Sequence, residues 1–149
     1  MLNVSVNEVR LAYNAFRRMN EEIRLQQKPA WRVSRLLGKL KPVVASFEET
    51  QLKLYNDAGG IEGGGGIQLT LTPKGENETA ESFSARQKEF SAKVSALNND
   101  LRELGEESVD VDYDPLPWSM FDDAPNASED KKLKYNPNDL ADAGPFLIE

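Results

Sequence analysis

The sequence predicts a mainly α-helical (α+β) fold, in which an antiparallel hairpin of two long helices follows an N-terminal helix and accompanies a small two-stranded β element. Two stretches of equal length, 30–54 and 80–104, carry apolar residues at alternating spacings of three and four. This spacing is typical of helices that pack along a seam. Two short segments instead alternate apolar and polar residues, which indicates strands.

The first helix is expected to start near Ser5. Ser5 and Glu8 have the spacing of a capping box, in which a hydroxyl and a carboxylate satisfy free backbone N–H groups. Pro29 should end or redirect this helix, because the residue before a proline avoids the helical conformation. The apolar stripe of the helix consists of Val9, Ala12, Phe16, Met19 and Ile23, with Tyr13 beside it.

The second helix has the clearest pattern and contains one proline. Pro42 removes a backbone hydrogen bond and presses on Gly38 four residues earlier, so we expect a kink or two abutting helices there. The polar residue Gln51 interrupts the seam. The seam comprises Ala30, Val33, Leu37, Leu40, Val44, Phe47, Gln51 and Leu54.

A glycine-rich segment, 57–66, reads as a flexible connector to a short strand at 67–71. The third helix is expected from about Glu78 to Leu104, with Gly105 as its C-terminal cap. Because the two seams have equal length, they can zip together as a hairpin or pair with copies of themselves. The third helix's seam comprises Ala80, Phe83, Gln87, Phe90, Val94, Leu97, Leu101 and Leu104.

The C-terminal part begins with a second predicted strand, 109–113, which we expect to pair with 67–71. Residues 115–121 are rich in proline and aromatic side chains, and 122–138 are acidic and polar. The apolar end, 146–148, is costly to expose and should dock on the helices. These features suggest a helical domain over 1–114 and a docking C-terminal segment over 115–149.

The composition limits the chemistry that the protein can perform. The 149 residues include neither cysteine nor histidine, which excludes disulfides, thiolate or imidazole catalysis and the common zinc sites. The net charge is -7, and no apolar run is long enough for a membrane helix. We therefore expect no membrane association and no direct DNA binding. No signal peptide is apparent, and a reducing cytosol fits a chain without cysteine.

Two motifs have simpler explanations than ligand binding. Asp110, Asp112 and Asp114 alternate like calcium ligands, but Pro115 and Phe121 stand where a calcium loop needs glycine and glutamate. They are better read as the solvated face of a strand. The glycine run 63–66 leads into a strand and lacks the lysine of a phosphate-binding loop, so it is read as a connector.

A basic stripe near the start of the second helix is the best candidate site. Its cations recur at spacings of four, three and four, and no acidic residue lies between 28 and 41. Such a stripe can hold phosphates or an acidic partner, although it can equally be a solvated helix face paired with the acidic C-terminal half. The charge distribution supports either reading, since residues 1–56 hold ten Lys/Arg against five Asp/Glu. The candidate ligand-binding residues are Lys28, Trp31, Arg32, Arg35 and Lys39.

No catalytic arrangement is visible in the sequence. The paired carboxylates at 48–49, 106–107 and 122–123 are adjacent in sequence, and adjacent side chains do not face each other on a helix or strand. We expect a protein that is not an enzyme, with no cofactor and no metal.

Several segments resemble a family of small proteins that tailed phages and prophages encode and to which no activity is assigned. The likeness lies in residues 28–37, 47–49 and 55–57, and in the ending at 139–140 and 145–149. The resemblance implies a viral origin, with a location in the host cytoplasm or in the virion. It carries no active-site residues.

The leading hypothesis is a phage protein that acts through protein–protein contacts, as a homo-oligomer or with a phage or host protein. A second hypothesis is a binder that sequesters a nucleotide immune signal through the basic stripe. A third is an acidic inhibitor of a host nucleic-acid enzyme acting through 106–130. The candidate interaction residues are Trp118, Phe121, Phe146, Leu147 and Ile148.

Overall fold

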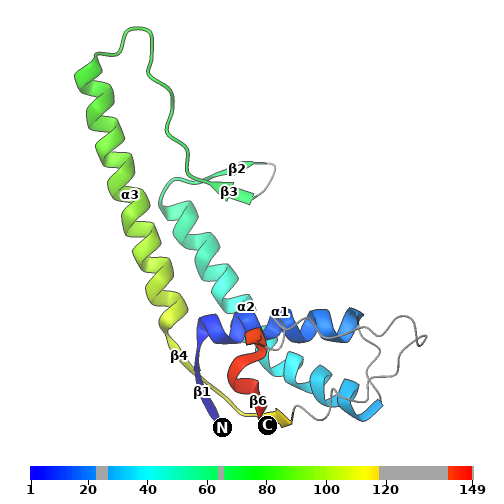
Figure 1. Ribbon diagram of the computed structural model, residues 1–149. Helices are drawn as coiled ribbons and strands as arrows, with labels where there is room; N and C mark the ends of the chain where they lie inside the picture. The colour runs from blue at the N-terminus through cyan, green and yellow to red at the C-terminus, as the bar shows by residue number, and fades with distance from the viewer. Residues whose placement is uncertain (23–26, 64–65, 118–140, 149) are drawn as a thin grey trace. The chain divides into compact units, whose positions relative to one another are not determined.

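The structure is a computed structural model that describes residues 1–22, 27–63, 66–117 and 141–148. It confirms the mainly α-helical (α+β) class (Figure 1). The long helices are α1 (Val6–Glu22), α2 (Gln27–Asp57) and α3 (Ala80–Glu106). The short strands of the described ranges pair as β1 (Leu2–Ser5) with β4 (Ser108–Val111), β2 (Ile61–Gly63) with β3 (Gly66–Gln68), and β5 (Leu116–Pro117) with β6 (Leu147–Ile148).

The chain divides into two compact units. Unit 1 comprises Met1–Ser46 and Glu106–Glu149, and unit 2 comprises Phe47–Gly105. The N-terminal part of α2 therefore belongs to unit 1 and its last turns belong to unit 2. These boundaries differ from the division after residue 114 that the sequence suggested, because the C-terminal segment shares a core with α1.

The predicted start of α1 is confirmed. The Ser5 N–H donates to the Glu8 carboxylate at 2.7 Å, and the Glu8 N–H donates to Ser5 Oγ at 3.2 Å. This reciprocal capping box satisfies two N–H groups that the helix itself leaves free. The expected apolar stripe is the buried face of α1, with Val9, Phe16 and Met19 fully buried.

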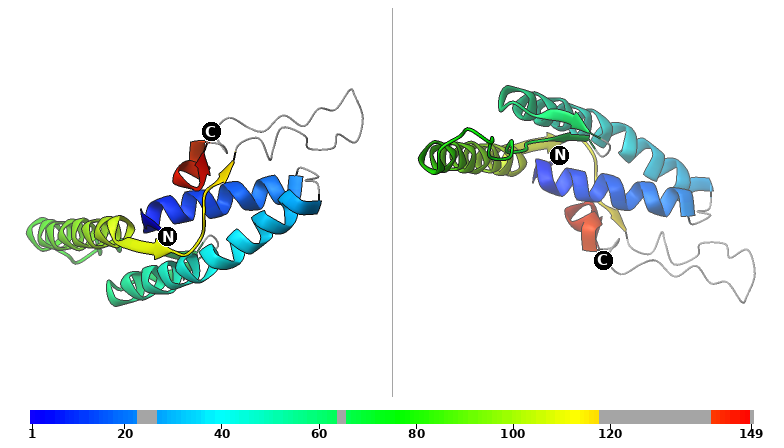
Figure 2. Two further views of the ribbon diagram at one scale, coloured as in Figure 1. Left: turned by 90° about the horizontal axis from the view of Figure 1, so that it is seen from below. Right: turned by 90° about the horizontal axis from the view of Figure 1, so that it is seen from above.

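The core of unit 1 joins α1, α2 and the C-terminal segment. Val33, Leu36 and Leu40 of α2 lie fully buried in this core, and no residue of α3 belongs to it. The prediction that the α2 seam packs against α3 is therefore wrong for the N-terminal part of α2. There the seam packs in the core of unit 1. Both views in Figure 2 show the red C-terminal segment lying against α1.

The boundaries of α2 also differ from those expected. The helix begins at Gln27, so Pro29 falls in its first turn and does not end the preceding helix. A proline fits there because the first N–H groups of a helix have no partner within it. The helix then runs through Pro42 without a break, so the alternative of two abutting helices is wrong.

The predicted strand pairing is wrong. Strand β4 pairs with β1 at the N-terminus, with Val4 opposite Val109, and β3 pairs with β2 in a hairpin. Residues 69–71, expected in the strand with 67 and 68, lie outside it. The β1–β4 pairing continues into α1 through a hydrogen bond from the Val6 N–H to the Glu107 carbonyl at 2.9 Å. It places the chain that follows β4 beside the start of α2.

In unit 2, the glycines after α2 form a defined helix end, whereas the sequence suggested a flexible connector. The Gly60 N–H donates to the Tyr55 carbonyl at 2.8 Å, and the Gly59 N–H donates to the Asn56 carbonyl at 3.0 Å. This is a Schellman motif, which needs a left-handed residue, and Gly59 has φ of +88°.

Helix α3 starts two residues later than expected. The Thr79 hydroxyl accepts a hydrogen bond from the Ser82 N–H at 3.1 Å and so caps the helix. Among the described helices, none is long and apolar enough to cross a membrane.

Candidate functional site

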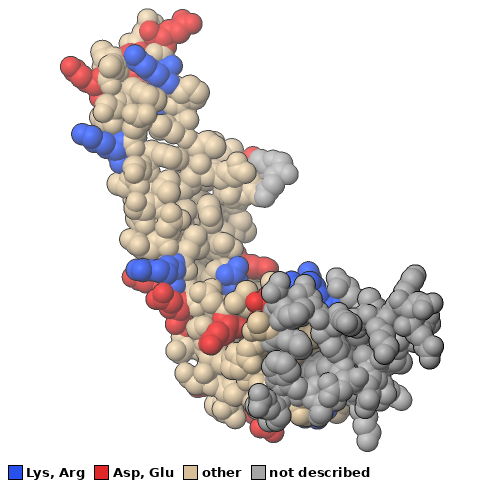
Figure 3. Space-filling model, in the orientation of Figure 1, with Lys and Arg blue, Asp and Glu red and all other residues tan. Residues whose placement is uncertain are grey.

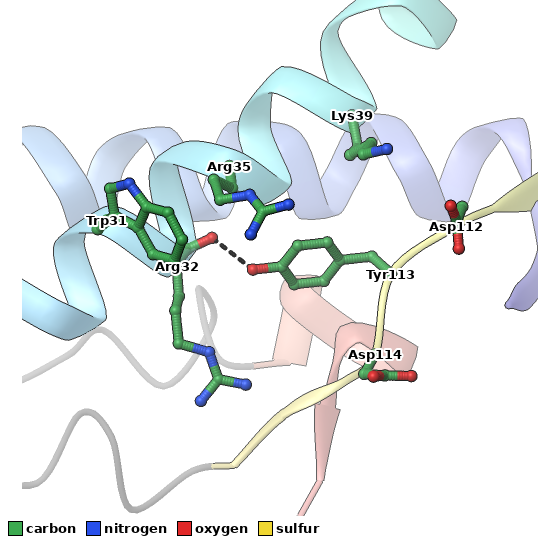
Figure 4. Close-up of a pocket in the computed structure, with 7 residues that line it drawn as sticks. All are labelled: Trp31, Arg32, Arg35, Lys39, Asp112, Tyr113 and Asp114. Atoms are coloured by element: carbon green, nitrogen blue, oxygen red, sulfur yellow. Dashed lines mark hydrogen bonds between the residues drawn. The ribbon is translucent and has the colours of Figure 1, made fainter.

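Unit 1 contains an open pocket of about 380 Å³ on the basic face of α2. One wall is the start of α2 and the other is the chain that follows β4 (Figure 4). The lining residues are Trp31, Arg32, Arg35, Lys39, Asp112, Tyr113 and Asp114. The pocket is near the lower end of the usual size range for small-molecule sites, about 300–1,000 Å³.

Helical spacing brings the cations of this wall together. Arg32, Arg35 and Lys39 are three and four residues apart, so they follow one face of α2. Trp31 precedes Arg35 by four residues, and the Arg35 guanidinium lies 4.9 Å from the centre of the indole ring. That contact is a cation–π interaction, which favours this relative orientation of the two side chains. Trp31 nevertheless remains 60% exposed.

Tyr113 joins the two walls. Its hydroxyl donates a hydrogen bond to the Arg32 backbone carbonyl at 2.8 Å. In Figure 4 the ring extends from the β4 side toward α2, and the guanidinium groups of Arg35 and Arg32 lie on opposite sides of it in the view. The phenol therefore sits at the centre of the pocket and holds the chain after β4 against α2.

The charge of the pocket is uneven. Three cations come from α2, and Asp112 and Asp114 come from the opposite wall, which gives a formal net charge of +1. The two arginines lie at the Trp31 end and the aspartates lie at the β4 end (Figure 4). Such a pocket can hold one anionic group at one end and hydrogen-bond donors at the other.

The structure brings together four of the five predicted ligand-binding residues. The side chain of the fifth, Lys28, lies outside the described side chains. Sequence reasoning missed Asp112, Tyr113 and Asp114 as part of this site, because it treated the aspartates only as a solvated strand face. Both aspartates are indeed exposed. What placed them here is the pairing of β4 with β1, and the alternating Leu2, Asn3, Val4 and Ser5 would have been the signal for that pairing.

The predicted interaction residues fall into two groups. Phe146 and Leu147 are buried in the core of unit 1, so they do not form a surface for a partner. Their burial confirms that this part of the tail docks on the protein's own chain. Trp118, Phe121 and the side chain of Ile148 lie outside the described part of the structure.

Unit 2 presents a different surface, the apolar stripe along α3. Of the eight stripe positions between 80 and 104, Leu97 alone is buried. Ala80 and Gln87 are exposed, and the other five are partly buried. The visible face over the middle of α3 is largely free of charged side chains (Figure 3). We call this surface the α3 stripe: Ala80, Phe83, Gln87, Phe90, Val94, Leu97, Leu101 and Leu104.

Unit 2 has little of its own structure to cover the α3 stripe. The part of α2 in unit 2 is residues 47–57, much shorter than the 27-residue α3. Among the residues described in unit 2, Phe47 and Leu97 are the large apolar side chains that are buried. Leu52 and Ile61 are at least half-exposed. The buried core of unit 2 is therefore small, and the apolar residues of the α3 stripe other than Leu97 are only partly buried or exposed.

No protein-family model matches this chain, and no curated protein or solved structure is similar enough to count as a match. In the described part of the chain, no group of three or more acidic residues has the geometry to hold a metal ion. The pocket and the α3 stripe are the two features of the described residues that bear on function.

Proposed function

We propose that this chain is a non-enzymatic, phage-encoded protein that acts through protein–protein contacts and associates with a second copy of itself through the α3 stripe. The observation that carries the proposal is the incomplete burial of the stripe along a helix of 27 residues. The phage origin rests on the resemblance of residues 28–37 and 145–149. The role fits a virion-related assembly or contact with a host protein.

The spacing of the α3 stripe favours a helix as its partner. Its residues alternate at three and four, which is the pattern of a heptad seam, and α3 is about 40 Å long at 1.5 Å per residue. The residues that follow Phe83, Phe90 and Leu97 are Ser84, Ser91 and Asn98. These short, uncharged side chains let a second helix approach closely. A copy of α3 supplies an apolar seam of matching length.

Charge also favours a second copy at this surface. The whole chain carries a net charge of -7, which makes copies repel each other in general. Within α3, however, four Lys/Arg nearly balance five Asp/Glu. The α3 stripe is therefore a surface on which two copies can meet with little repulsion and with apolar area to bury.

Sedimentation velocity at micromolar concentration tests the proposal. The parent protein should sediment as a multiple of the 16.6 kDa chain. Phe90→Glu places a charge at a partly buried position of the stripe and should reduce the mass to that of one chain. The matched control, Ala92→Glu, adds the same charge at an exposed position outside the stripe and should leave the assembly intact. A monomeric parent, or a Phe90→Glu variant that assembles as the parent does, overturns the proposal.

A second variant tests self-association through the α3 stripe even if Phe90→Glu fails to fold. Gln87 is the exposed, polar position of the α3 stripe, so Gln87→Leu completes the apolar seam without disturbing a packed residue. Association should then be tighter, with the midpoint of dissociation moved to a lower protein concentration. An unchanged or weaker association contradicts the assignment of the stripe.

A further inference from the structure

We infer that the pocket between α2 and the chain after β4 binds a nucleoside monophosphate. This ligand site goes beyond the proposed self-association, because all seven lining residues belong to unit 1 and none belongs to the α3 stripe. The inference rests on an aromatic surface, a pair of arginines and two carboxylates that surround one open volume (Figure 4).

The arginine end fits a single phosphate group. The Arg35 guanidinium lies 4.9 Å from the centre of the Trp31 ring, while the Arg32 guanidinium lies on the other side of the Tyr113 ring in Figure 4, so Arg35 is the expected phosphate ligand. A guanidinium matches phosphate oxygens geometrically and forms charge-assisted hydrogen bonds with them. Because Asp112 and Asp114 reduce the formal charge of the pocket to +1, one phosphate is favoured over a polyphosphate or a nucleic-acid backbone.

The remaining groups fit a nucleoside. The exposed indole of Trp31 offers a flat surface on which a base can stack, as bases do on aromatic side chains in single-strand binding proteins. The aspartates have carboxylate oxygens that accept hydrogen bonds from ribose hydroxyls or exocyclic amines. The pocket volume of about 380 Å³ suits a ligand of this size. The Tyr113 hydrogen bond to α2 keeps the two walls in place.

Fluorescence titration of the full chain tests this inference. The chain has two tryptophans, so Trp118→Phe leaves Trp31 as the single reporter. At least one of the two nucleotides tested, adenosine 5′-monophosphate and guanosine 5′-monophosphate, should quench the fluorescence of Trp31 in a saturable way. Inorganic phosphate and free adenosine should bind at least about tenfold more weakly than the nucleotide, because each makes only part of the contacts.

Two variants locate the site. Arg35→Ala should weaken nucleotide binding by about tenfold or more, since it removes a charge-assisted contact. Lys41→Ala removes a cation from the same helix outside the pocket and should leave binding unchanged. Phe90→Glu, which targets self-association, should also leave nucleotide binding unchanged. Failure of the self-association proposal can therefore be distinguished from failure of the nucleotide-binding inference.

The absence of saturable quenching by both nucleotides overturns the inference. Equal binding of inorganic phosphate, or equal loss in both cation variants, overturns it too.

Discussion

Arg86 connects α3 to the segment that precedes it. Its guanidinium donates to both oxygens of the Glu78 carboxylate, at 2.7 and 2.6 Å, and to the Thr72 carbonyl at 3.1 Å. A bidentate pair of this kind is more specific than a single contact. The pair therefore fixes the path of residues 72–78, which have no regular secondary structure beyond a turn.

The Glu78–Arg86 pair predicts a pH dependence. The hydrogen bond from Arg86 holds the pKa of the Glu78 carboxyl below its usual value. The pair's stabilising effect is thus present at neutral pH and is lost as the pH falls through this lowered pKa. A carbon-13 titration of the Glu78 carboxyl should show a lower midpoint in the parent than in Arg86→Ala. Equal midpoints contradict the pairing.

Gly60 should tolerate no side chain. A Cβ at this position would lie 2.4 Å from Ile67 Cγ2 and 2.8 Å from the Tyr55 carbonyl oxygen. The second contact is with helix backbone, which cannot move aside easily. Gly60→Ala should therefore lower the free energy of unfolding by about 1–3 kcal/mol, as overpacking does. Gly75→Ala is the control, because the nearest atom to its Cβ is at 3.8 Å. Chemical denaturation of the two variants compares them, and equal stabilities rule out the strain.

At the scale of single residues, a contact was predictable from the sequence when its partners lie close together in the chain. The Ser5–Glu8 capping box follows from a spacing of three and was predicted correctly. The role of Gly59 and Gly60 was missed, because glycine composition alone does not distinguish a helix cap from a connector. The contact between Tyr113 and Arg32 joins residues 81 positions apart and has no local signal.

At the scale of elements, the seams predicted which residues form helices but not which helix each seam meets. A heptad pattern defines an apolar face, and any element with a complementary face can cover it. Leu40 and Val33 are buried against α1 and the C-terminal segment, where the sequence predicted α3. The pairing of β4 was likewise wrong, because an alternating pattern shows which face is apolar but not which strand lies beside it.

The C-terminal segment is an element of the core of unit 1. Phe146 is fully buried in the cluster that contains Phe16 and Met19. Phe146→Ala should lower the free energy of unfolding by about 3–5 kcal/mol, since it leaves a cavity in a packed core. The control variant Leu11→Ala, on the exposed side of α1, should change the free energy of unfolding by less than about 0.5 kcal/mol. Thermal or urea unfolding measures both. Comparable losses in the two variants contradict the burial of Phe146.

At the scale of the whole molecule, the two units differ in how much apolar surface they bury. Unit 1 contains a continuous core built from α1, α2 and the C-terminal segment. Unit 2 leaves most of the α3 stripe only partly buried. The candidate pocket was only half predictable, since its α2 wall follows from helical spacing and its other wall depends on a strand pairing between the two ends of the chain.

Self-association should make stability depend on protein concentration. A partner that binds the folded state stabilises it by mass action, so the melting temperature should rise as the protein concentration rises. The Ala92→Glu control should show the same rise, and Phe90→Glu should not. Melting temperatures of the parent that stay constant over a hundredfold range of concentration contradict this expectation.

Distance measurement by pulsed electron paramagnetic resonance tests most directly whether α3 meets α3 of a second copy, as proposed. The chain has no cysteine, so Ala92→Cys provides one spin label per chain, and every measured distance then lies between chains. Association through the α3 stripe should give a discrete distance that disappears on dilution with unlabelled protein and in a Phe90→Glu background. A signal without any discrete distance, or one that persists unchanged in that background, contradicts the claim.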